Sequence, residues 1–176
     1  STRDGDLELY TMNLNGTGTR RITTELGYDG GAFFSWDGAR IVYRGYHPKD
    51  STEVAEYKTL LAEQLVKPAK MEIFVCDAEG IVHTQLTNNG AANFAPFFHP
   101  NNKKIIFASN MNDPGGRSFE LYLMNTDGSN LEQITFGGHF NSFPMFTRDG
   151  KKLVFVSDRH SQGPYEFNVF IADWVN

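Results

Sequence analysis

Five histidines are the side chains best suited to bind a metal ion or to transfer a proton. They are His47, His83, His99, His139 and His160. None forms a His-x-His or His-x-x-x-His pair, the spacings that bring two imidazoles to one metal from a strand or a helix. Scattered histidines can still converge in a fold, but isolated histidines on the surface or in loops are the simpler interpretation.

Nucleophilic chemistry has little support. A serine hydrolase needs a Gly-x-Ser-x-Gly elbow, and no such pentapeptide occurs. Ser35, Ser109 and Ser157 follow expected strand ends, where a hydroxyl commonly stabilises a turn. The single cysteine, Cys76, excludes an internal disulfide and a cysteine-rich zinc site. Cys76 lies in an apolar run, so we expect a buried and unreactive thiol.

Three polar residues recur at equivalent places before an expected aromatic strand. They are Asp29, Asn93 and Asn141, separated by 64 and then 48 residues. If these strands lie side by side, their side chains could line the mouth of a funnel and contact a ligand. Alternatively, each could cap its own turn, which is a common role of Asp and Asn.

His139 and Phe140 break this recurrence, because Gly27 and Ala91 stand where His139 would be in the earlier copies. The exception is the better candidate for ligand binding, so we predict contacts from His139 and Phe140. Trp36, next to an Asp-Gly turn, is a further candidate contact residue on the surface.

The elements that must position these residues follow from a repeat. Short, continuous apolar runs indicate strands that are covered on both faces. Each of the first three runs is followed by a two-residue turn with Gly in second place, then by a short strand ending in Thr, an aromatic strand and a β-branched strand. The runs begin at Leu9, Ile73, Leu121 and Val169, with spacings of 64, 48 and 48 residues.

Four antiparallel strands in each unit are typical of stacked propeller blades. We therefore predict an all-β fold, a β-propeller of four-stranded antiparallel blades, with about three to three and a half blades in one partial domain, 1–176. A β-sandwich would not require so regular a repeat. The expected parts are the outer strands of a first blade (1–26), a second blade (27–90), a third (91–138) and a last blade that lacks its outer strand (139–176).

The longer first spacing indicates an insertion at 46–70 within the second blade. We expect a helix over Glu53–Val66, with an apolar face and with Asp50 or Ser51 as its cap. Lys67-Pro68 would end it. The apolar face consists of Val54, Tyr57, Leu61 and Leu65.

Composition excludes two classes of partner. The net charge is −5 and no long basic run occurs, which argues against nucleic acid and against an anionic membrane surface. No apolar run approaches the roughly 18 residues of a membrane helix. Aromatic residues make up 14% of the chain, which suits packed sheets.

The segments Glu120–Asn130 and Asp149–Arg159 resemble the propeller repeats of the TolB family, as does the Thr that ends each outer strand. The chain is most similar to the C-terminal part of a stand-alone TolB-like protein, with a helical insertion at Tyr57–Met71. The resemblance implies a periplasmic or otherwise exported protein. Related blades serve as protein-binding scaffolds, as gating domains of serine peptidases and as platforms for a lyase of pectin fragments.

We therefore expect a non-catalytic scaffold that binds a protein or a small ligand at the propeller mouth, without a cofactor. The alternative is a lyase that acts on acidic oligosaccharides with a divalent metal held by histidines. The expected strands are fewer than the roughly 24 of a six-bladed ring. The chain is thus either part of a longer propeller or half of a homodimer, in which Arg20–Thr24 of one copy completes the last blade of the other.

Overall fold

The described part of the chain folds into four antiparallel β-sheets and one helix. The computed structural model describes residues 1–68, 70–113, 116–137 and 139–175. The first sheet is β1 (Tyr10–Thr11) and β2 (Arg20–Arg21), and the second is β3 (Tyr28–Phe34), β4 (Arg40–Tyr46), β5 (Glu72–Asp77) and β6 (His83–Gln85). The third sheet is β7 (Asn93–Phe98), β8 (Lys104–Ser109), β9 (Glu120–Asn125) and β10 (Glu132–Gln133), and the last is β11 (Asn141–Phe146), β12 (Lys152–Ser157) and β13 (Asn168–Asp173). Helix α1 (Ser51–Ala62) lies between β4 and β5.

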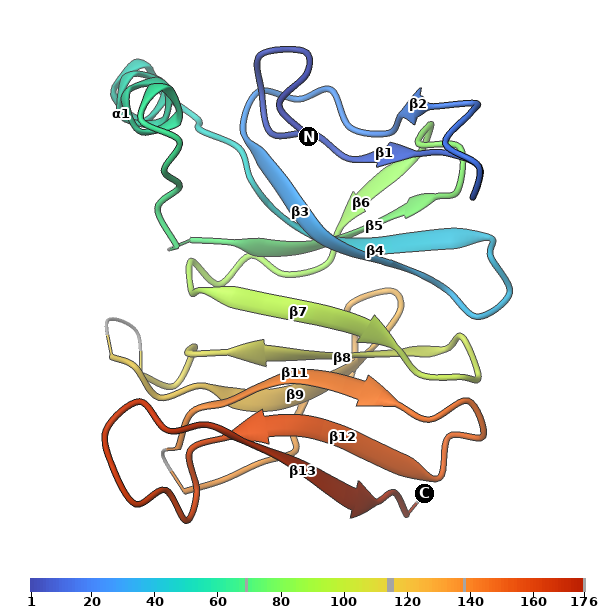
Figure 1. Cartoon of the computed structure of the whole chain (residues 1–176), viewed down its shortest axis with the longest axis vertical. Helices are drawn as coiled ribbons and strands as arrows, with labels where there is room; N and C mark the ends of the chain where they lie inside the picture. Colours follow the sequence, from blue (N-terminus) through green and yellow to red (C-terminus); the bar gives the residue numbers. More distant parts are fainter. Residues whose placement is uncertain (69, 114–115, 138, 176) are drawn as a thin grey trace.

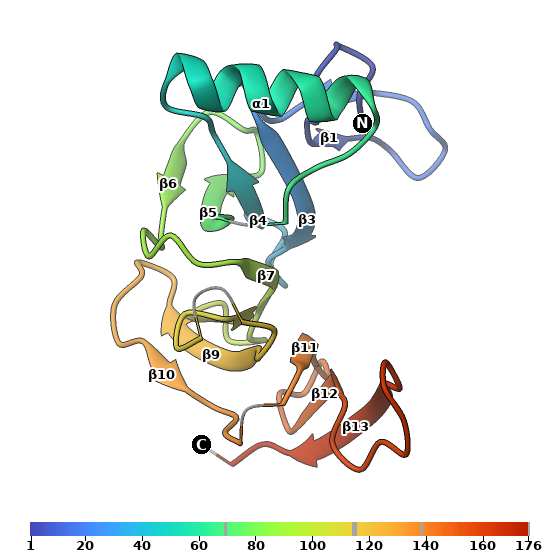
Figure 2. The same cartoon turned by 90° about the vertical axis from the view of Figure 1, so that its left-hand side faces the viewer.

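The sheets are stacked in chain order, and within each sheet every strand pairs with its neighbour in sequence (Figures 1 and 2). The edge strands β3, β7 and β11 lie against one another across neighbouring sheets. Consecutive meanders stacked through their inner strands are propeller blades. The predicted all-β partial propeller of about three blades is confirmed.

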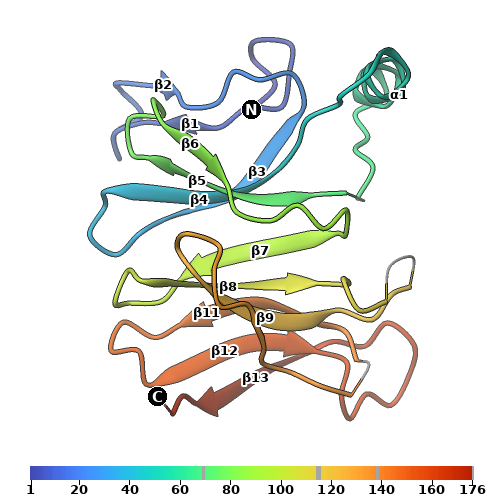
Figure 3. The same ribbon diagram turned by 180° about the vertical axis from the view of Figure 1, so that it is seen from behind.

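The two ends of the stack differ. Long connections occupy one end, at 47–71, 110–119 and 158–167, and we call this the loop end. Tight turns occupy the opposite end, which we call the turn end. Figures 1 and 3 show the loop end on the side of α1 and the turn end on the other side. Rigid strands therefore present long, variable segments on one face only, an arrangement that commonly carries function.

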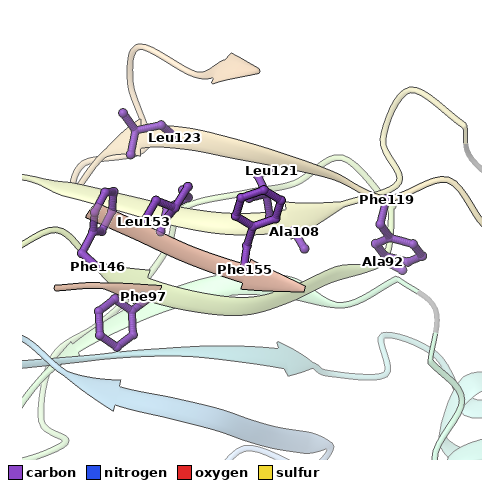
Figure 4. Packing of buried hydrophobic residues seen from close by; sticks show 10 residues of the cluster. Ala92, Phe97, Ala108, Phe119, Leu121, Leu123, Phe146, Leu153 and Phe155 are labelled. Atoms are coloured by element: carbon purple, nitrogen blue, oxygen red, sulfur yellow. The ribbon is translucent and has the colours of Figure 1, made fainter. Parts of the chain in front are cut away.

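Apolar clusters fill the space between neighbouring sheets. Along β8, Ile105 packs towards the second sheet and Ile106 towards the last, and both are fully buried. This explains the continuous apolar run, because a strand covered on both faces needs no polar side. Figure 4 shows the cluster between the third and last sheets, where Leu121, Leu153 and Phe155 meet. Burial of each such side chain stabilises the fold by about 1.5–3 kcal/mol.

The inner strands carry a bulge at equivalent places. The register shifts within β3, β7 and β11, and Gly31, Ala95 and Phe143 have positive φ there. Pro96 and Pro144 lie within the bulge on these edge strands, where the ladder is already interrupted, so their missing backbone donor breaks no continuous pairing.

The last sheet exposes an apolar outer face. Met145, Val154 and Ile171 are paired across its three strands, and Val156 and Val169 form a second row. Val169 is 72% exposed and Ile171 64%. The opposite face of the same sheet is buried against the third sheet.

The predicted helix is displaced. It begins at Ser51, where Asp50 accepts hydrogen bonds from Thr52 N and Glu53 N, both at 2.9 Å, so the proposed cap is present. The helix ends at Ala62, before Lys67-Pro68, because Gln64 takes a positive φ of 61°. Three residues of the expected apolar face are covered, since Tyr57 is buried and Val54 and Leu61 are half-buried, but Leu65 lies beyond the helix and is exposed.

Candidate functional site

A buried glutamate joins each blade to the next at the loop end. Glu72, the first residue of β5, accepts a hydrogen bond from Thr87 Oγ1 at 2.6 Å and one from Asn93 Nδ2 at 3.3 Å through the same oxygen, Oε2. Thr87 Oγ1 in turn accepts from Ile73 N at 2.8 Å. We call this set of Glu, Thr and Asn the glutamate clasp.

The same clasp recurs one blade later. Glu120 Oε2 accepts from Thr135 Oγ1 at 2.5 Å and from Asn141 Nδ2 at 2.8 Å, and Thr135 Oγ1 accepts from Leu121 N at 2.8 Å. Glu and Thr belong to one blade and Asn to the inner strand of the next. A charged acceptor strengthens each of these bonds, so the clasp fastens neighbouring blades where the chain crosses between them.

Asn93 and Asn141, expected to line a funnel mouth or to cap their own turns, are both fully buried. Their amides reach the clasp glutamates rather than solvent, and Asn93 Nδ2 also donates to Met71 O at 2.7 Å. The geometry gives these two residues a role in joining blades.

The first clasp departs from the pattern. Glu8 accepts from Thr23 Oγ1, but its second partner is the guanidinium of Arg21. Asp29 stands where the later clasps have asparagine. An ionised carboxylate cannot donate as an amide does, so Asp29 makes different contacts.

Asp29 is bridged to Glu25 by a histidine. His47 Nε2 lies 3.1 Å from Asp29 Oδ1, and its Nδ1 lies 3.4 Å from Glu25 Oε2. Burial alone would lower the pKa of His47, but the hydrogen bond to Asp29 and the nearby carboxylates outweigh burial and raise it above its usual value. Both His47 and His99 lie in loops, directly after β4 and β7, as expected, but neither is a fully exposed histidine, because His47 is half-buried and His99 is buried.

His139 and Phe140 lie in the crossing from the third sheet to the last. His139 is exposed, and its Nδ1 lies 3.1 Å from Asp158 Oδ1. The same oxygen accepts from Phe140 N at 2.9 Å. Asp158 therefore fixes this segment of the loop end, beside the buried Asn141.

Phe140 also forms one wall of an aromatic pocket at the loop end. Its ring centroid lies 5.5 Å from that of Phe119 and 5.1 Å from that of Phe167. The pocket has a volume of about 390 Å³, and Arg117 and Asp158 contribute charged groups to its lining. We call this the aromatic pocket; its lining is completed by Ser161, Gly163, Pro164 and Tyr165.

The sequence did not indicate this pocket. Tyr165 and Phe167 belong to the connection 158–167, which resembles neither of the other two long connections. Tyr165 is 80% exposed and has a positive φ of 63°, an uncommon conformation for a bulky side chain. Exposed aromatic side chains over a concave pocket are typical of binding sites.

Trp36 follows the end of β3 at the turn end, whereas the candidate Asp29 lies at the start of that strand. Its indole Nε1 donates to Phe98 O at 3.0 Å, and its backbone N donates to Asn102 Oδ1 at 2.8 Å. The ring also meets Phe97 edge-on, with 6.2 Å between centroids. Although 40% exposed, Trp36 joins the second sheet to the third.

Within the described ranges, no three His, Cys, Asp or Glu side chains are arranged to hold a metal ion. No helix in the same part of the chain is long and apolar enough to cross a membrane. Cys76 is buried as predicted, and burial raises the pKa of its thiol to about 12.

Comparison with known proteins relates this geometry to one family. The family model of the TolB β-propeller domain matches residues 58–174. No curated protein sequence matches the chain. Among solved structures, a TolB candidate from Agrobacterium tumefaciens is 24% identical with a TM-score of 0.71, over 97% of this chain and 54% of its own.

Two further structures share the fold at lower identity. TolB from Acinetobacter baumannii is 22% identical with a TM-score of 0.66, over 94% of this chain and 35% of its own. An oligogalacturonate lyase in complex with manganese is 16% identical with a TM-score of 0.51, over 98% of this chain and 57% of its own. The chain thus spans about half or less of the length of the two TolB structures. With the family model matching most of its length, the chain belongs to the TolB β-propeller domain family.

Proposed function

We propose that this chain is a non-catalytic binding propeller of the bacterial envelope, which recognises a segment of a partner protein at its loop end. The observation that carries the proposal is the aromatic pocket, open at the loop end and bordered by the exposed Tyr165. Membership of the TolB propeller family supports an envelope location and a binding role.

The chemistry of the pocket favours a peptide segment with an apolar anchor. Phe119, Phe140 and Phe167 provide apolar walls, while Arg117 and Asp158 offer a donor and an acceptor to a peptide backbone. Burial of one leucine or phenylalanine side chain would contribute about 1.5–3 kcal/mol, roughly a factor of ten or more in Kd.

A second copy of the chain is our proposal for the apolar outer face of the last sheet. Val169 and Ile171 are exposed there, and apolar rows of this kind are ordinarily covered by a neighbouring blade. Head-to-tail association, with Arg20–Thr24 of one copy as the missing outer strand of the last blade, would place the second sheet of that copy against this face. Light scattering tests it: a strict monomer at high concentration contradicts this part of the proposal.

The alternative, a lyase with a histidine-bound divalent metal, gains no support from the described side chains. His139 contacts Asp158, whereas His47 contacts Asp29 and Glu25. The likeness to the lyase structure shows the fold alone.

The test uses peptides selected from a random display library on the immobilised protein. We expect the selected peptides to share one aromatic or large aliphatic residue. Their affinity should fall about tenfold or more for Tyr165→Ala and for Phe140→Leu, which trims the wall without emptying it. Leu14→Ala, at a fully exposed apolar residue of the turn end, is the matched control and should leave Kd unchanged.

Two results would overturn the proposal. One is peptide binding that is unaffected by Tyr165→Ala and Phe140→Leu although both variants keep the thermal stability of the parent. The other is an equal loss of affinity for Leu14→Ala, which would indicate general adhesion to exposed apolar residues.

A further inference from the structure

Asp29 is a buried acid at a position built for an amide. In the two later clasps Asn93 and Asn141 each donate to a glutamate. The Asp29 side chain is only 1% exposed, and its Oδ2 has no hydrogen-bond partner among the described residues. A buried acceptor without a donor destabilises the fold. A ligand that donates a hydrogen bond to Asp29 Oδ2 would remove this cost.

The neighbouring residues do not supply this donor. Gly45 is paired with Asp29 across the sheet, where the later blades have Ser109 and Ser157. A Cβ at Gly45 would come within 2.7 Å of Asp29 Oδ1, so any side chain there would displace the carboxylate. His47 donates only towards Oδ1.

Asp29 and His47 line a cavity of about 150 Å³ between the first and second sheets. That volume is comparable with engineered cavities that admit benzene. Glu25 adds a second carboxylate, and Tyr43 and Phe74, stacked at 5.3 Å between centroids, add aromatic surface. None of the described residues that line the cavity is Lys or Arg.

We propose that this cavity binds a primary ammonium group, which donates to the carboxylate of Asp29 and lies against the rings of Tyr43 and Phe74. An ammonium group offers three donors and one positive charge, and aromatic faces attract such cations. The ammonium group could belong to a free small amine or to a lysine side chain of a partner. A metal ion is not the expected occupant, because no metal-binding group of three side chains occurs in the described ranges.

His47 competes with this cation for the same carboxylates. Protonated, it places a positive charge between Asp29 and Glu25; neutral, it leaves that charge to the ligand. The other titratable groups around it are Glu8, the Tyr43 hydroxyl and His83, which hydrogen-bonds to Tyr43 at 2.9 Å. Binding should therefore tighten as the pH rises and His47 loses its proton.

The experiment is an NMR titration that follows the His47 and Tyr43 ring signals. Methylammonium represents a free amine, Nα-acetyl-lysine methylamide represents a lysine side chain, and methanol is the uncharged control. We expect saturable shifts with one or both amines up to roughly 100 mM, none with methanol, and tighter binding at about pH 8 than at about pH 6. Shifts with methylammonium alone identify a small free amine, and shifts with both admit a lysine side chain.

Asp29→Asn is the decisive variant, because it restores the residue that both later clasps carry and should fold. We expect it to weaken amine binding about tenfold or more, whereas Asp149→Asn, at an exposed turn, should have no effect. His47→Gln should remove the pH dependence while retaining binding. Absence of saturable shifts with both amines, or equal binding by Asp29→Asn, would overturn the proposal.

Discussion

Replacing Thr87 by valine tests whether the glutamate clasp stabilises the propeller. Valine has nearly the same shape, so packing is retained while two hydrogen bonds are lost. In the parent protein Thr87 Oγ1 donates to Glu72 Oε2 at 2.6 Å and accepts from Ile73 N at 2.8 Å, and the valine variant loses both bonds. Both bonds are buried, so water does not replace them readily.

The expected loss follows from these two bonds. A hydrogen bond to a charged group contributes about 1.5–3 kcal/mol, and a buried amide left without an acceptor costs about 1–3 kcal/mol. Because such terms are not fully additive, we expect the free energy of unfolding to fall by about 3 kcal/mol. With a urea m value of about 2 kcal/mol/M, the midpoint should decrease by about 1.5 M.

Urea unfolding followed by tryptophan fluorescence measures this change. Thr87→Ser keeps the hydroxyl and deletes a methyl group, so it should cost about 1 kcal/mol. Thr147→Val is the second control, because its hydroxyl also binds an acid, Asp149, but in an exposed turn; the cost there should be about 1 kcal/mol or less.

The reasoning is refuted if Thr87→Val and Thr147→Val destabilise the protein equally. It is also refuted if Thr87→Ser costs more than Thr87→Val, since packing rather than hydrogen bonding would then hold the position.

Three further predictions concern glycine, thiol and imidazole groups. Gly80→Ala should lower the free energy of unfolding by more than about 2 kcal/mol, because the added Cβ would lie 2.7 Å from Ile22 O. Gly16→Ala, where the Cβ would meet open space, should cost only about 1 kcal/mol because of the positive φ of Gly16. Urea unfolding measures both changes. Cys76 should resist alkylation by iodoacetamide at about pH 8 until the protein unfolds, because only the thiolate reacts; rapid labelling of the native state would contradict its burial. An NMR titration should place the pKa of His47 above and that of His99 below the usual histidine value. The contribution of His47 to stability is therefore present at low pH and lost as the pH rises through its folded pKa, whereas the contribution of His99 is lost as the pH falls. The opposite order of the two pKa values would contradict the buried carboxylate contact of His47.

The fold could be predicted because the residues that recur in the repeat are the ones whose side chains face the core. The apolar runs beginning at Ile73 and Leu121 are strands covered on both faces, and the strands fall in the expected order. The helix end was not predictable, because nothing in the composition around Gln64 reports a positive φ.

The clasp glutamates recur in the sequence with the period of the blades. Glu8, Glu72 and Glu120 obey the same offsets as the threonines they bind, and Glu72 and Glu120 the same offset as the asparagines they bind. Glutamate is rarely buried, so its recurrence before an apolar run suggests a strand end rather than a core group. Only the pairing of strands shows that each one is enclosed.

The contact of Asp29 with His47 depends on the bulge in β3. Phe33 is paired with Val42, and the same count would place Asp29 opposite Tyr46. The bulge shifts the register by one, so Asp29 faces Gly45 and its side chain has room beside His47. The same shift occurs in β7 and β11, so the acidic cavity is specific to the second sheet because Asp29 and Gly45 replace the Asn and Ser that face each other in the later blades.

The glutamate clasp also bears on how such propellers change length during evolution. The segment 91–138 brings Asn93, which completes the clasp of the blade before it, and carries Glu120 and Thr135, which are completed by the Asn of the blade after it. Duplication or deletion of this whole segment leaves every buried glutamate with its donors. A breakpoint between Glu120 and Thr135 that is out of register with the repeat would separate the glutamate from its threonine. Gene rearrangements that respect the crossing are therefore the ones that preserve a foldable protein, and blade number can vary while the joint itself stays the same.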